Sequence, residues 1–158
     1  MIRSLAAALS LVAGQAAALS CLPPDVAASF QRAEAIEEPV YILRGTLTFD
    51  RTLMPDGVVN EPRTPAPVPA YFKGRGLTLD GFTARFERPV TLQPVCFGPW
   101  CGNAVPGKEA IVFATVLGDD VVIEVDPCGG SVFYDPTEDM ARTLQTCLQG
   151  GACEPAVR

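Results

Sequence analysis

Hydrophobic and polar positions alternate along much of the chain with the two-residue period that is typical of β-strands. The clearest predicted strand covers residues 40–49, which are rich in β-branched and aromatic side chains. Two more strands, 71–79 and 82–95, are joined by a tight turn at Asp80-Gly81. At the start of the second one apolar and polar residues alternate, so we expect one buried and one solvated face.

Two strands in the second half of the chain lack this alternation. Residues 110–117 and 121–125 are almost continuously apolar and are joined by Gly118-Asp119-Asp120. A short continuous apolar run is typical of a strand that is buried on both faces. We therefore expect this hairpin to lie in the core, followed by a short extended piece at 132–133.

A helix is predicted near each end of the folded region. The first covers about 25–36, where Asp25 can cap the helix and apolar residues recur on one face. The second begins with Asp135 as its cap and Glu138 completing a capping box, and it stops at Gly150-Gly151. No helix is predicted between the strands, which argues against a βαβ arrangement.

Glycine and proline residues indicate where the strands bend. Gly45 predicts a bulge or a sharp bend in the first strand, and Gly74 and Gly76 are predicted bend points in the second. Residues 50–68 are predicted to form a long loop, either functional or a tolerated surface insertion. Residues 21–158 are therefore predicted to form one mainly β domain. We expect a small five-stranded OB-like antiparallel barrel with short N-terminal and C-terminal helices.

The first twenty residues form a predicted secretory signal peptide, with Arg3 in a positive region, an apolar stretch at 5–13 and small residues at 16–18. Cleavage after Ala18 fits this pattern best, whereas cleavage after Ser20 would make Cys21 the first mature residue. No later segment is long and apolar enough to cross a bilayer. The sequence therefore predicts a secreted or periplasmic protein.

The mature chain contains six cysteines, which after a signal peptide predict a disulfide framework formed in an oxidising compartment. Six cysteines allow about 15 complete pairings. Closeness in sequence favours Cys96–Cys101 and Cys147–Cys153, and leaves Cys21–Cys128 as a long bridge. Because Cys96 and Cys101 lack the Cys-x-x-Cys spacing and a basic neighbour, we expect a structural bridge and not a redox pair.

Charge and composition exclude several classes of function. The formal net charge is −6, which gives no electrostatic footprint for nucleic acid or an anionic membrane. Histidine is absent, so no Ser-His-Asp or Cys-His pair can form. One set of carboxylates could suggest a calcium site but lacks the spacing of a known calcium loop and fits a solvated hairpin end: Asp119, Asp120, Glu124 and Asp126. A second set could suggest catalytic acids but is better explained by helix capping: Asp135, Glu138 and Asp139. We therefore predict no enzyme activity, no metal and no cofactor.

The spacing of cysteines and glycines resembles the netrin-like domain found in tissue inhibitors of metalloproteinases. In the first half the resemblance rests on Cys21-Leu22-Pro23-Pro24, Phe30, Val40-Tyr41 and Gly45. In the second half it rests on Cys101-Gly102, Gly107, the apolar strand at 110–114, Cys128, Phe133, Pro136 and Cys153. The resemblance spans nearly the whole mature chain, and it implies an OB-like barrel without catalysis whose role is to bind a protein.

Several cysteines depart from the family pattern. The inhibitors chelate the zinc of the protease with the α-amine and carbonyl of an N-terminal cysteine. Cys21 matches the second of two cysteines that the family has near this end, and the first would fall at Leu19. Gln31 replaces the family's third cysteine, while Cys96 and Cys147 are additions. Zinc chelation therefore requires that Cys21 becomes the mature N-terminus.

In the resembling inhibitors the N-terminal segment and a neighbouring loop form one binding ridge. Transferred to this chain, the ridge would contain Cys21, Leu22, Pro23, Phe97, Trp100 and Gly102. The alternative is that Phe97 and Trp100 pack down over one end of the barrel. We expect a secreted, non-catalytic module that binds a protein partner, with inhibition of a secreted metalloprotease as the specific version. A structural or interaction protein of the periplasm or cell envelope is the alternative function.

Overall fold

The computed structural model describes residues 20–55 and 65–156. Nearly all of the predicted signal peptide, and the middle of the predicted loop at 50–68, lie outside these residues. In chain order the elements are α1 (Val26–Glu34), β1 (Val40–Phe49), the 3-10 turn η1 (Arg51–Leu53), β2 (Val68–Thr78), β3 (Gly81–Pro94), β4 (Cys96–Phe97), β5 (Trp100–Cys101), β6 (Glu109–Leu117), β7 (Asp120–Val125), β8 (Val132–Tyr134) and α2 (Glu138–Leu148).

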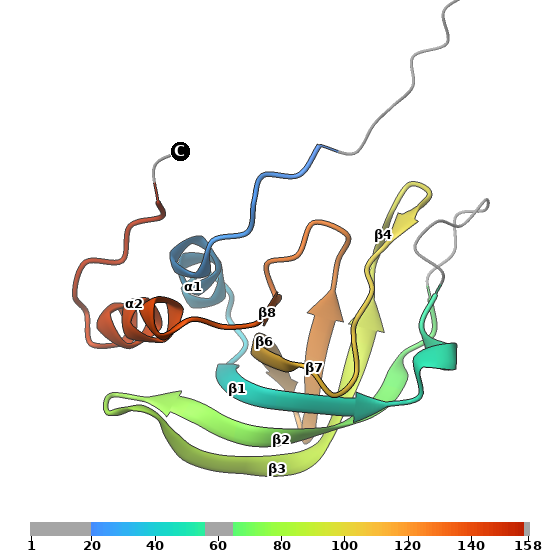
Figure 1. Cartoon of the computed structure of the whole chain (residues 1–158), viewed down its shortest axis with the longest axis horizontal. Helices are drawn as coiled ribbons and strands as arrows, with labels where there is room; N and C mark the ends of the chain where they lie inside the picture. Colours follow the sequence, from blue (N-terminus) through green and yellow to red (C-terminus); the bar gives the residue numbers. More distant parts are fainter. Residues whose placement is uncertain (1–19, 56–64, 157–158) are drawn as a thin grey trace, which may run out of the picture.

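Five strands form a sheet that closes into a ring (Figure 1). The hydrogen-bonding order is β1-β2-β3-β7-β6, and β6 pairs with β1 to complete the ring, while β8 pairs with residues 110–112 of β6, before the residues that pair with β7. Four of the five joins are antiparallel, as predicted, but β3 and β7 are parallel. The prediction of a wholly antiparallel arrangement is wrong at this join. An odd number of strands cannot alternate in direction around a closed ring, so one join must be parallel.

The main hydrophobic core fills the inside of this ring. Leu43 and Leu47 of β1 meet Phe72 of β2, Leu92 of β3 and Ile123 of β7 there, and all five side chains are almost completely buried. Burying one such side chain contributes about 1.5–3 kcal/mol relative to leaving it exposed. The interior is therefore a packed core and not a channel.

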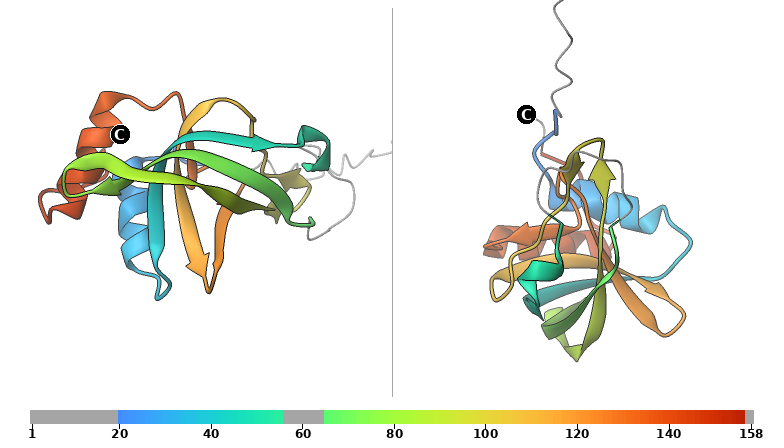
Figure 2. Two further views of the ribbon diagram at one scale, coloured as in Figure 1. Left: turned by 90° about the horizontal axis from the view of Figure 1, so that it is seen from below. Right: turned by 90° about the vertical axis from the view of Figure 1, so that its right-hand side faces the viewer.

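A second core lies between the ring and the two helices, which sit side by side on its outer surface (Figure 2). Phe30 of α1 and Leu144 of α2 pack there against Ile111 and Phe113 of β6. Because β6 turns Val112 into the ring and its neighbours toward the helices, both faces of the strand are buried. This arrangement confirms the prediction of a buried apolar strand for residues 110–114, whereas the end of the run at Leu117 is exposed.

Glycine allows the backbones of the paired strands β1 and β2 to approach each other closely. Gly45 and Gly74 are paired across the two strands. A β-carbon added to Gly45 would stand 2.2 Å from the carbonyl oxygen of Lys73, and one added to Gly74 would stand 2.2 Å from that of Arg44. The register shift lies elsewhere, between Gly76 and the residue after it in β2. Gly45 therefore permits close contact of backbones, and the predicted bulge occurs on the neighbouring strand.

The helix starts agree with the sequence in one case and differ in the other. Asp25 caps α1, as predicted, because its Oδ1 accepts hydrogen bonds from the amides of Ala27 and Ala28 at 2.9 and 3.0 Å. In α2 the cap is Thr137, with Met140 at the third helical position, and the prediction of Asp135 is wrong. Asp135 has a φ of 50° and its carboxylate pairs instead with Lys108.

All three predicted disulfides are present: Cys21–Cys128, Cys96–Cys101 and Cys147–Cys153. Disulfides persist in oxidising compartments, so the folded protein belongs outside the cytoplasm. Within the described ranges, no helix has the length and apolar character needed to cross a membrane.

Candidate binding ridge

The segment between β3 and β6 begins with a very short hairpin. Cys96 faces Cys101 and Phe97 faces Trp100 across the two arms, and the disulfide links the arms covalently. Gly98 makes the turn with a φ of 59°, a conformation that favours glycine. The Trp100 ring lies beside this turn, because a β-carbon added to Gly98 would be 3.9 Å from Cζ3 of the indole. The tip is therefore small and covalently closed.

The base of the hairpin is attached to the end of β7. The Val95 amide donates to the carbonyl of Val125 at 2.9 Å, and the Gly102 amide donates to the carbonyl of Val95 at 2.8 Å. Gly102 is buried, and a β-carbon there would stand 1.9 Å from the Val125 carbonyl oxygen. Of the residues predicted to bind a partner, Gly102 thus lies beneath the surface, where it lets the hairpin approach the ring.

The aromatic side chains of the tip do not pack into the ring. Phe97 is 42% exposed and Trp100 is half-buried. Neither side chain belongs to the core inside the ring or to the core beneath the helices. Their half-exposed positions at the tip disfavour the alternative in which both residues close one end of the barrel.

The N-terminal segment runs across the loop that follows β7. Cys21 is exposed and is joined to Cys128 in that loop, with 5.2 Å between their Cα atoms. Pro24 lies against the same loop, since its Cγ would be 3.7 Å from a β-carbon on Gly129. Leu22 is 88% exposed, which is an unusual degree of exposure for a leucine that is held between a disulfide and a helix cap.

The N-terminal segment, the loop after β7 and the β4–β5 hairpin rise from the same side of the ring (Figures 1 and 2). Cys101 and Cys128 line one hollow of about 320 Å³ between the loop and the hairpin. Each belongs to a different disulfide, so both bridges meet this hollow. We call Leu22, Pro23, Phe97 and Trp100, together with the two disulfides, the binding ridge.

The hollow of the binding ridge is acidic. Glu124 and Asp126 line it, and none of the described residues along its wall is basic. The Asp126 carboxylate accepts a hydrogen bond from the Cys128 amide at 2.8 Å, which fixes the loop that carries the long disulfide. Tyr134 also lines the hollow, and burial raises the pKa of its phenol, although its hydroxyl accepts a hydrogen bond from the Val105 amide at 2.7 Å, which acts in the opposite direction.

The carboxylates weighed as metal ligands or catalytic acids are not gathered into a site. The described part of the chain contains no group of three or more histidine, cysteine, aspartate or glutamate residues placed to hold a metal ion. Asp135, Glu138 and Asp139 each form an ion pair, with Lys108, Arg44 and Arg142 respectively. The pairs of Asp135 and Glu138 connect separate elements of the fold, so these carboxylates have structural partners.

Sequence reasoning missed a second hollow, of about 490 Å³, on β1, β2 and β3. Phe86 and Arg88 of β3 line it together with Tyr41 of β1. The two-residue spacing of Phe86 and Arg88 is a signal that they share one face, but nothing in the sequence brings Tyr41 beside them.

Comparison of the chain with protein-family models, curated proteins and solved structures found no match.

Proposed function

We propose that this protein is a secreted or periplasmic, non-catalytic module of the netrin-like type that binds a protein partner through the binding ridge. One observation carries the proposal most directly. Two disulfides from distant parts of the chain meet at a single hollow, and each has an exposed apolar residue next to one of its cysteines in sequence, Leu22 after Cys21 and Phe97 after Cys96.

The proposal includes the type of fold. A ring of five strongly bent strands with a single parallel join and a packed interior supports a small OB-like barrel. The N-terminal segment is attached to this barrel through Cys21–Cys128, a pairing with which the netrin-like resemblance agrees.

The physical properties of the ridge suit protein recognition. Binding costs free energy when flexible side chains and loops become ordered, at about 0.5–1.5 kcal/mol per immobilised side chain. The Cys96–Cys101 bridge and the turn at Gly98 fix the hairpin before any partner arrives. Phe97 and Trp100 are large anchors, and aromatic side chains of this kind dominate many binding interfaces.

The specific version of the proposal is inhibition of a secreted zinc metalloprotease. It requires cleavage after Ser20, so that the α-amine and carbonyl of Cys21 can reach the zinc of the protease. The sulfur of Cys21 is already held by Cys128, and the residue is exposed. An N-terminus at this place would therefore be both anchored and accessible.

Two forms of the protein test this version, one beginning at Cys21 and one beginning at Leu19. Both should be assayed against a broad panel of zinc metalloproteases after their intact masses have confirmed three disulfides. We expect the Cys21 form to inhibit at least one protease and the Leu19 form to be at least about tenfold weaker, because in the longer form the nitrogen of Cys21 is a peptide amide and not a free α-amine. Full protease activity with both forms would exclude the inhibitor version and leave binding without inhibition.

A further inference from the structure

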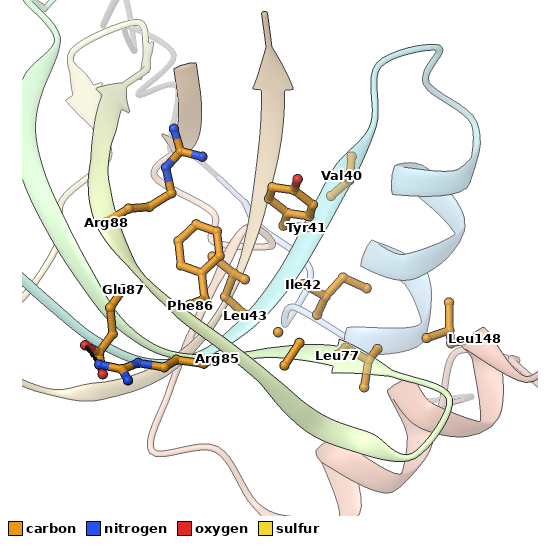
Figure 3. Close-up of a pocket in the computed structure, with 12 residues that line it drawn as sticks. Val40, Tyr41, Ile42, Leu43, Leu77, Arg85, Phe86, Glu87, Arg88 and Leu148 are labelled. Atoms are coloured by element: carbon orange, nitrogen blue, oxygen red, sulfur yellow. Dashed lines mark hydrogen bonds and ion pairs between the residues drawn. The ribbon is translucent and has the colours of Figure 1, made fainter. Parts of the chain in front are cut away.

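The hollow on β1, β2 and β3 has no role in the binding ridge (Figure 3). It has a volume of about 490 Å³, which lies within the range of about 300–1,000 Å³ that small-molecule sites occupy. Its walls come from residues 40–43 of β1, from Gly76 and Leu77 of β2, from residues 84–88 of β3 and from Leu148 at the end of α2. We call it the β3 groove.

The topology of the ring explains why this groove is open. β3 pairs with β7 only from Thr91 to Pro94. Among the described residues, the part of β3 before position 91 therefore has a strand partner on one side only, which is β2. Through the gap that remains, Phe86 meets Tyr41 edge to face, with 5.7 Å between the ring centroids. Aromatic side chains therefore form part of the base of the groove.

One end of the groove is cationic. Arg88 and Phe86 project to the same side of β3, and the Arg88 guanidinium and the Tyr41 hydroxyl lie at the same end of the groove (Figure 3). The Arg88 guanidinium donates one hydrogen bond, to the carbonyl of Asp119 at 3.0 Å. A guanidinium has about five N–H donors, so most of them remain available to a ligand. Arg85 differs, because it projects to the other side of β3 and pairs with Glu87 at 2.8 Å.

The opposite end of the groove is aliphatic. Ile42, Leu77 and Leu148 line it, from three separate elements. Leu148 is 38% exposed although it belongs to an amphipathic helix with a well-packed face. An apolar ligand body laid along this end would cover surface that the fold leaves exposed to water.

We propose that the β3 groove binds an amphipathic monocarboxylate with an extended aliphatic body, its carboxylate on Arg88 and its chain along Ile42, Leu77 and Leu148. A guanidinium pairs with a carboxylate through strong charge-assisted hydrogen bonds. A peptide strand added to the free edge of β3 is disfavoured, since Pro89 cannot donate and the neighbouring Arg85 and Glu87 are charged, features that protect strand edges from pairing. The site stands whether or not the ridge binds a protein.

Calorimetric titration of the full mature chain with three probes of equal alkyl length tests the ligand class: decanoate and decyltrimethylammonium, each below its micelle concentration, and 1-decanol below its solubility limit. We expect decanoate to bind at one saturable site, decanol to bind more weakly, and the cation to show no binding. Equal affinity for all three probes, or no saturable binding of decanoate, would overturn the proposal.

Two variants locate the site. Arg88→Gln should weaken decanoate binding about ten- to hundredfold, which is the loss expected for charge-assisted hydrogen bonds, while decanol binding stays the same. Arg75→Gln removes the same charge from β2 outside the groove and should change neither affinity. Thermal unfolding of each variant shows whether it is folded. Loss of decanoate affinity in both variants to the same degree would contradict the placement of the carboxylate on Arg88.

Discussion

Gly102 lies so close to Val125 that a methyl group in place of its hydrogen would stand 1.9 Å from the Val125 carbonyl oxygen. This contact, together with the hydrogen bonds from Val95 to Val125 and from Gly102 to Val95, fixes the β4–β5 hairpin to the end of β7. The position of the hairpin is therefore determined by backbone contacts beneath it. The exposed side chains at its tip contribute little to that position.

Replacement of Gly102 by alanine should therefore be strongly destabilising. We expect the free energy of unfolding, measured in urea, to fall by at least about 2 kcal/mol, because backbone atoms must move to admit the methyl group. Gly76→Ala is the matched control, since the nearest atom to a β-carbon there is 3.6 Å away and the cost should stay below about 1 kcal/mol. Equal losses in the two variants would contradict the close approach at Gly102.

The three disulfides should contribute unequally to stability. Cys21–Cys128 closes a separation of 107 residues, whereas Cys96–Cys101 closes one of 5. In the chain-entropy treatment the long bridge is worth about 4–5 kcal/mol and the short one about 2 kcal/mol. Paired serine substitutions at each bridge, compared by urea unfolding, should therefore rank in this order. The opposite order would show that the hairpin bridge supports the ring and not only its own tip.

The aromatic tip should be replaceable at little cost to the fold. Phe97→Ser and Trp100→Ala should each lower the free energy of unfolding by less than about 1 kcal/mol, because neither side chain belongs to a core. By comparison, Leu92→Ala, which truncates a fully buried residue, should cost about 2–5 kcal/mol. A loss at Trp100 as large as that at Leu92 would mean that the indole is a structural residue.

Tyr134 should make the stability depend on alkaline pH. Burial raises the pKa of its phenol in the folded state, so the neutral form is favoured by folding. This contribution is complete below the ordinary tyrosine pKa of about 10 and is lost as the pH rises through the higher pKa of the folded protein. Tyr134→Phe cannot show this loss, although it gives up the hydrogen bond from Val105. The difference in unfolding free energy between the wild type and Tyr134→Phe should shrink above about pH 10. A constant difference would contradict a raised pKa of the Tyr134 phenol in the folded state.

Much of the fold could be predicted because it depends on local patterns. The strand at 40–49, the cap at Asp25 and the doubly buried part of β6 at 110–114 follow from residue type and spacing alone. The two short disulfides follow from closeness in sequence, because nearby cysteines meet easily.

The remaining features depend on contacts between distant segments. The parallel join of β3 and β7 follows from closing the ring, which no single strand encodes. Asp135 resembles a helix cap in sequence, yet Lys108, 27 residues earlier, provides a partner for its carboxylate. In the candidate site, the exposure of Leu22 and Phe97 and the burial of Gly102 depend on how the N-terminal segment and the hairpin pack against distant parts of the chain. The β3 groove could not be predicted because four elements, β1, β2, β3 and α2, contribute to its walls.

The most direct test of the binding ridge is the inhibition constant of the form that begins at Cys21, measured with any metalloprotease it inhibits, for the wild type, Phe97→Ser and Leu117→Ser. The two side chains are similarly exposed, at 42% and 49%, but Leu117 lies in the β6–β7 hairpin outside the ridge. We expect Phe97→Ser to weaken inhibition at least about tenfold, the loss of one apolar anchor, and Leu117→Ser to leave it unchanged. Equal inhibition by all three proteins would contradict the proposed binding ridge, and no inhibition of any protease by the wild type would exclude the inhibitor version of the function.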